Sequence, residues 1–158
     1  MKKASKKKLL VGLGNLLSGD DCFGIQVIGQ LQKDRPKYMA GVSVVEAHTD
    51  LLNHIEDFSE YDCVVLVDAV LDPEKKLGEP GAVVTLDEEA LQSFSEESHS
   101  VHQMSPLLAV KLFRTLHPEA QTQIFLIGLL VDQITHDLRY ATAERIAEAA
   151  AGIHRMLI

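Results

Sequence analysis

The hydrophobic positions of the chain fall into two patterns that alternate along its length. Short apolar runs bounded by glycine, proline or acidic residues are typical of buried strands, and longer segments with apolar residues three or four apart are typical of amphipathic helices. The predicted strands are 9–13, 42–45, 63–67, 82–86 and 124–131. One predicted helix begins after residue 22, and the others cover 51–58, 107–116 and 140–157.

This order of elements favours one fold class. Strands that alternate with helices form parallel sheets whose faces are covered by those helices. We therefore predict an α/β three-layer sandwich, with a mostly parallel twisted sheet of about five strands, helices on both faces, and 82–86 at an edge. No internal repeat or linker interrupts residues 1–158, so we expect a single domain.

Charge and hydropathy exclude several classes of partner. The 15 basic and 23 acidic residues give a formal net charge of -8, which repels nucleic acid. No apolar stretch reaches the roughly 20 residues needed to cross a bilayer. We expect a soluble cytoplasmic protein and read residues 1–8 as a flexible basic leader, with a membrane or partner tether as the alternative.

Polar residues gather where the predicted strands end. Asp20 and Asp21 follow the first strand, Glu46 and His48 follow the second, and Asp68 closes the third. His99 and His102 precede the helix that begins after Ser105-Pro106. In an open α/β sheet ligands bind beyond the carboxyl ends of the strands, so we expect these residues to lie near one site.

Two carboxylates and an imidazole are ligands that a borderline divalent ion accepts. Such an ion can activate water and polarise a peptide carbonyl. The positions are too far apart in sequence to form a metal motif by themselves, and Cys22 is a further possible ligand whose alternative is packing. The two cysteines, Cys22 and Cys63, form no CxxC pair and fit a reducing compartment.

A dinucleotide-binding turn is the competing interpretation of Gly12-Leu13-Gly14. Its third glycine would fall at position 17, which is Leu17. Asp20 and Asp21 would also repel a pyrophosphate placed there. We therefore disfavour a nucleotide-binding module.

Three segments together resemble the [NiFe]-hydrogenase maturation endopeptidases. Residues 11–24, with the sequence VGLGNLLSGDDCFG, are similar to that family's N-terminal signature. Residues 65–69 (VLVDA) resemble its strand that ends in Asp-Ala, and residues 100–103 (SVHQ) resemble its Ser-x-His-Gln segment. The resemblance spans most of the chain.

The resemblance implies a function and a set of site residues. It implies a cytoplasmic, monomeric endopeptidase that removes the C-terminal extension of a hydrogenase large-subunit precursor after nickel insertion. Asp21, Asp68 and His102 would bind the nickel already seated in the substrate. Further residues would contact the substrate or shape the loops around the site, namely Gly14, Asn15, Asp20, His48 and Thr49.

Two departures from the family pattern leave a second function open. The family usually carries Asp-Gly-Gly-Thr after the second strand, where this chain has Glu46-Ala47-His48-Thr49. The family's Pro-Glu pair is also missing near residues 127–132. A non-catalytic binding or assembly factor of the same fold is therefore the main alternative.

Each proposed ligand also has an ordinary structural explanation. Asp21 could cap the helix that begins near Cys22, and Asp20 suits a cap or turn. Asp68 could accept backbone hydrogen bonds in a turn. His48 and His99 compete with His102 as the imidazole ligand. The acidic residues Glu88, Glu89, Glu96 and Glu97 are predicted to form a solvated face.

Overall fold

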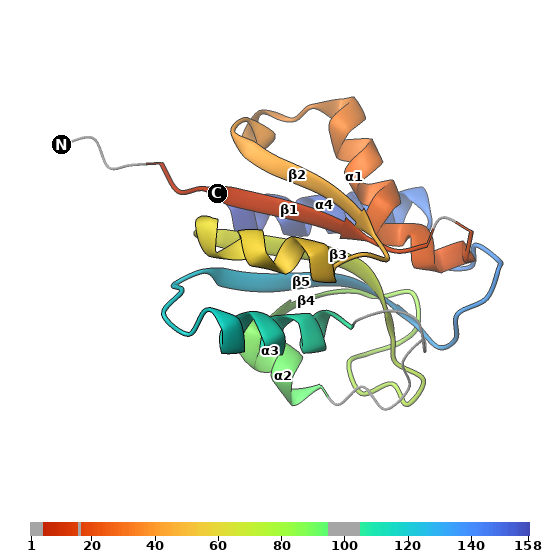
Figure 1. Ribbon diagram of the computed structural model, residues 1–158. Coiled ribbons are helices and arrows are strands. Elements are labelled where there is room, and N and C mark those ends of the chain that lie inside the picture. Colours follow the sequence, from red (N-terminus) through yellow and green to blue (C-terminus); the bar gives the residue numbers. More distant parts are fainter. Residues whose placement is uncertain (1–4, 16, 95–104) are drawn as a thin grey trace.

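Five strands form one sheet in the order β2-β1-β3-β5-β4 (Figure 1). The structure is a computed structural model that describes residues 5–15, 17–94 and 105–158. The strands are β1 (Lys8–Leu13), β2 (Val42–His48), β3 (Cys63–Leu71), β4 (Val83–Asp87) and β5 (Gln123–Val131). All neighbours pair in parallel except β4, which is antiparallel to β5 and lies at one edge. The mostly parallel sheet and the edge position of 82–86 are confirmed.

Helices cover both faces of the sheet. The α-helices are α1 (Phe23–Asp34), α2 (Glu88–Ser93), α3 (Pro106–Leu116) and α4 (Ala143–Leu157), and the 3₁₀ segments are η1 (Gly19–Cys22), η2 (Lys37–Met39) and η3 (Leu52–Glu60). One core, which includes Leu10 and Val65, packs against α1 and α4; the other, which includes Leu66 and Phe113, packs against η3, α2 and α3. The three-layer α/β sandwich is confirmed.

The helix boundaries follow local capping chemistry. Ser105 Oγ accepts a hydrogen bond from Leu108 N at 3.1 Å, and Pro106 occupies the first turn of α3. Thr142 caps α4 in the same way. None of the helices within the described part of the chain combines the length and hydrophobicity that a membrane span requires.

Several elements differ from the sequence expectations. Strand β3 continues past Asp68 because residues 68–71 pair with 128–131 of β5, and β2 continues through Glu46 to His48. The expected short helix at 51–58 is the 3₁₀ segment η3. The Glu88-Glu89 pair opens α2, whose start is capped by Asp87 and whose Leu91 is buried.

Residues 7 and 8, which the sequence predicts as part of a flexible basic leader, are held to the fold. Lys8 begins β1, and its side-chain Nζ contacts the carbonyl oxygen of Leu157. Lys7 N donates to Asp62 Oδ2 at 2.7 Å. Strand pairing and these contacts attach residues 7 and 8 to the folded chain.

Candidate functional site

The loop after β1 folds tightly around Asp21. Gly14 has φ +132°, and a Cβ at this position would lie 1.8 Å from the carbonyl oxygen of Asp21. Asn15 N donates to Asp21 Oδ2 at 3.2 Å, and Asp21 N donates to Ser18 O at 3.0 Å. Glycine is required at position 14 because a side chain there would displace the backbone that carries Asp21.

The Asp21 carboxylate is held within the loop that precedes α1. The residue before the helix is Cys22, which forms no side-chain cap hydrogen bond. The Asp21 carboxylate accepts from Asn15 N. Asp21 is half-buried at the carboxyl edge of the sheet.

Close packing at Gly24 brings this loop against the ends of two strands. A Cβ at Gly24 would lie 2.1 Å from the carbonyl oxygen of Val67 and 2.3 Å from that of Leu13. The first turn of α1 thus contacts β1 and β3 directly. Gly24 lies three residues after Asp21, and Val67 lies one residue before Asp68. This packing brings the backbone of the Asp21 segment to the part of β3 that carries Asp68.

Asp68 lies on the α3 side of the sheet. Leu66 and Val70, two residues before and after it, pack in the core under α3, and alternate residues of a strand share a face. Asp68 Oδ1 accepts from Ala69 N at 2.8 Å. Its partner in register on β5 is Gly128, which places no side chain beside the carboxylate.

The third predicted ligand, His102, lies outside the described residues, as does its competitor His99. Helix α3 begins at Pro106 on the face of the sheet toward which Asp68 is directed. Within residues 5–15, 17–94 and 105–158, no three His, Cys, Asp or Glu side chains form a group able to hold a metal ion. The set of Asp21, Asp68 and His102 stays a prediction.

His48 occupies an irregularity at the end of β2. Its φ is +52°, and its carbonyl oxygen accepts a hydrogen bond from Gly14 N at 2.8 Å. The pairing of β1 with β2 shifts here, so that Gly12 is opposite Glu46 and Leu13 is opposite His48. The imidazole is exposed, with Nε2 3.9 Å from Glu46 Oε2, and Thr49 is also exposed. The backbone of His48 therefore adjoins the loop that holds Asp21.

Asp20 has a structural role whose partners the sequence did not reveal. Its side chain is 4% exposed, and Oδ1 accepts from the backbone N–H groups of Arg139, Tyr140 and Ala141 at 2.9, 2.9 and 3.0 Å. These donors belong to the loop after β5. Asp20 therefore joins the loop of Asp21 to the loop that leads into α4.

The thiol of Cys22 is buried beside the acidic pair. Burial raises the pKa of this thiol, and the charges of Asp20 and Asp21 raise it further, against a backbone hydrogen bond that lowers it. A raised pKa keeps the thiol protonated near neutral pH, whereas metals bind the thiolate. This environment favours packing over a ligand role for Cys22.

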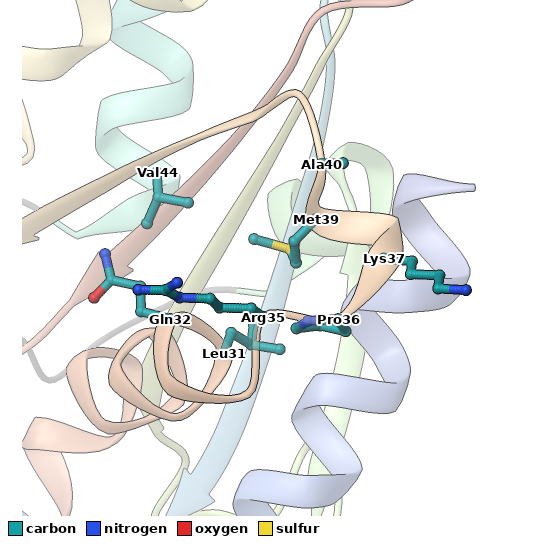
Figure 2. A pocket seen from close by; sticks show the side chains of 8 residues that line it. All are labelled: Leu31, Gln32, Arg35, Pro36, Lys37, Met39, Ala40 and Val44. Carbon is teal, nitrogen blue, oxygen red and sulfur yellow. The ribbon is translucent and has the colours of Figure 1, made fainter.

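A separate groove lies at the other end of α1. It has a volume of about 550 Å³ and includes Leu31, Arg35, Met39 and Val44 in its lining (Figure 2). Asp21 precedes the first residue of α1, whereas Leu31 and Arg35 are at its last turn. The groove is therefore not part of the site around Asp21.

Comparisons with known proteins agree with this fold. The model of a family described as hydrogenase maturation protease matches residues 25–156. The chain is similar to an inferred hydrogenase maturation protease of Methanocaldococcus jannaschii, with 30% identity over 149 residues that cover 91% of this chain and 90% of the relative. It is also similar to the hydrogenase expression/formation protein HoxM of Azotobacter vinelandii, with 25% identity over 128 residues that cover 80% of this chain. The chain spans only 58% of the length of HoxM.

Two solved structures share the fold. The [NiFe] hydrogenase maturation protease HybD from Thermococcus kodakarensis superposes with a TM-score of 0.72 and 22% identity, covering 96% of this chain and 99% of that one. The hydrogenase maturating endopeptidase HybD from E. coli gives a TM-score of 0.73 and 19% identity, covering 93% and 89%. At this identity the likeness establishes the fold alone. The family match, which extends over most of the 158 residues, establishes more: the chain belongs to the hydrogenase maturation protease family.

Proposed function

We propose that this protein is an endopeptidase that removes the C-terminal extension of a [NiFe]-hydrogenase large-subunit precursor after nickel has been inserted. The observation that carries the proposal is the packing of the Asp21 loop, through Gly24, against the strand that carries Asp68. Two carboxylates thus belong to adjoining segments at the carboxyl edge of the sheet, where this class of fold binds its ligands. Membership of the protease family supports peptide-bond hydrolysis as the reaction.

The proposed chemistry uses the nickel of the substrate. Asp21, Asp68 and His102 complete the coordination of that ion, so the enzyme engages only a precursor whose metal centre is assembled. Coordination places the scissile peptide beside an activated water, which attacks the carbonyl carbon. The C–N bond then breaks, the amine takes a proton, and the short C-terminal peptide leaves.

The loops around the carboxylates support this role through rigidity. Asn15 N and Ser18 O hold the side chain and the backbone of Asp21, respectively, and Asp20 fixes the neighbouring loop. A carboxylate held in place loses less conformational freedom when it binds an ion, which favours binding. His48 and Thr49 lie at the next strand end and are proposed to contact the peptide.

A non-catalytic assembly factor is the second candidate function. His48 favours it, because an imidazole stands at a left-handed backbone position where the family usually has bare glycine backbone. Cleavage of a precursor by this protein would show that assembly is not its only function.

The test is the intact mass of a large-subunit precursor before and after incubation with this protein. The precursor is prepared in nickel-loaded and nickel-free forms, and a related maturation protease that processes it serves as the positive control. We expect loss of a C-terminal peptide from the nickel-loaded form only. Unchanged mass in a precursor that the related protease cleaves would favour the assembly factor, and equal cleavage of both forms would remove the nickel requirement.

A further inference from the structure

Large apolar side chains are exposed on two loops beside Asp21. Leu17, on the loop after β1, is 83% exposed, and Ile134 and Leu138, on the loop after β5, are 41% and 60% exposed. Among the described residues, these three belong to a group of only seven exposed large hydrophobic side chains. Apolar side chains concentrated in one region of a surface indicate a binding site.

The two loops are joined into one structural unit, here called the two-loop platform (17–21 and 132–141). Gly19 has φ +56°, and a Cβ there would lie 2.3 Å from the carbonyl oxygen of Asp137. His136 Nδ1 is 3.3 Å from the carbonyl oxygen of Leu17, and Asp20 accepts the three backbone hydrogen bonds from residues 139–141. The two loops that carry the exposed apolar side chains are therefore in direct contact.

The platform is continuous with the candidate site. Leu17 and Asp21 belong to the same loop, and Asp21 N donates to Ser18 O within it. A partner that covers Leu17 would consequently lie next to the Asp21 carboxylate. An apolar surface in this position suits a protein substrate whose cleaved segment must reach that carboxylate.

The arginine of the platform is already paired within its own loop. Arg139 Nη1 pairs with Asp132 Oδ1 at 3.1 Å, and its guanidinium lies 4.9 Å from the centre of the Tyr140 ring. The cation of this loop is thus already matched by a carboxylate of the same loop. Binding through apolar burial depends little on ionic strength, because screening acts on charges.

We propose that the two-loop platform is the docking surface for an apolar segment of the large-subunit precursor, with Leu17 and Leu138 as its main contacts. The inference rests on the proposed function and names the part of this chain that recognises the substrate. Docking here would hold the precursor while Asp21 engages its metal centre. The contribution is therefore to binding and not to the chemical step.

The test compares a Leu17→Ser, Leu138→Ser double variant with wild type on nickel-loaded precursor. Leu116→Ser is the matched control, since Leu116 is 50% exposed at the last residue of α3, and that helix leads to the amino end of β5. We expect KM for cleavage to rise on the order of tenfold in the double variant, with kcat within about twofold and the melting temperature unchanged. The control should match wild type, and raised salt should leave wild-type KM within about twofold.

Equilibrium binding of fluorescently labelled precursor, followed by anisotropy, separates this inference from the proposed function. Weaker binding by the double variant supports the platform even if wild type does not cleave. Equal binding and equal KM for the double variant and wild type would overturn it. The proposal would also be overturned if Leu116→Ser weakened binding as much as the double variant does.

Discussion

Removal of the Asp20 carboxylate should destabilise the protein and loosen the loop before α4. In an Asp20→Ala variant the backbone N–H groups of Arg139, Tyr140 and Ala141 lose their common acceptor. A hydrogen bond to a charged group contributes about 1.5–3 kcal/mol, but these three share one oxygen and the donors are only partly buried. Taking about 1 kcal/mol for each donor, we expect the free energy of unfolding to fall by about 3 kcal/mol.

Asp20→Asn provides an intermediate case, since its amide keeps one oxygen acceptor without the charge. We expect this variant to lose about 1–1.5 kcal/mol. Asp137→Ala is the matched control, because Asp137 is in the same loop and its side chain is exposed. We expect the control to stay within about 0.5 kcal/mol of wild type.

The assay is urea unfolding followed by circular dichroism, together with amide hydrogen exchange of residues 139–141. Stability of single domains is on the order of 5–15 kcal/mol, so the variants should remain folded enough to measure. Exchange at the three amides should be fastest in Asp20→Ala and intermediate in Asp20→Asn. An Asp20→Ala variant as stable as the control, with unchanged exchange at 139–141, would refute the role assigned to Asp20.

Three further outcomes test the packing around the site. Gly24→Ala should lower the free energy of unfolding by about 3 kcal/mol, because a Cβ at this position meets only backbone atoms of Val67 and Leu13. Urea unfolding measures the loss, and a change below about 0.5 kcal/mol would show that α1 can move away freely. His48→Gly should raise stability by about 0.5–1 kcal/mol, because glycine adopts a positive φ without strain, and an unchanged or lower unfolding midpoint would contradict the left-handed backbone. Burial raises the pKa of both cysteine thiols above the unfolded value, so stability is full below about pH 8.5 and falls as the pH rises further. Urea unfolding from pH 7 to 10 should show a smaller fall in a Cys22→Ala, Cys63→Ala variant, and an equal fall would assign the effect to other groups.

The sequence was sufficient for most of the fold because each predicted strand carries a strong local signal. The run at 124–131 is apolar throughout, and the structure extends it by one residue to Gln123. Ser105-Pro106 combines a cap residue with a proline suited to the first helical turn, and α3 begins there. Strand β3 was predicted too short because an aspartate at position 68 interrupts its apolar run, whereas pairing with β5 continues to Leu71.

The candidate site was predictable only in part, because long-range contacts define it. The role of Asp20 depends on backbone donors in a loop 119 to 121 residues away, and no local pattern reports such a partner. The positive φ of His48 follows from a shift in register between β1 and β2, which an isolated strand sequence does not encode. Gly14 is the exception, since the sequence already assigned it to the loop before the acidic pair, and its φ is positive.

The most direct test of the proposed site is the rate at which wild type, Asp21→Asn and Asp68→Asn release the C-terminal peptide from nickel-loaded precursor. Asparagine keeps the shape of aspartate and removes the charge that binds a cation, so folding should be preserved while metal engagement is lost. Asp57→Asn, an exposed change in η3 and outside both the Asp21 loop and the two-loop platform, is the control. We predict that wild type and the control release the peptide at similar rates and that either site variant slows release by at least about a hundredfold. Release at the wild-type rate by both site variants would contradict the assignment of Asp21 and Asp68 to the reaction.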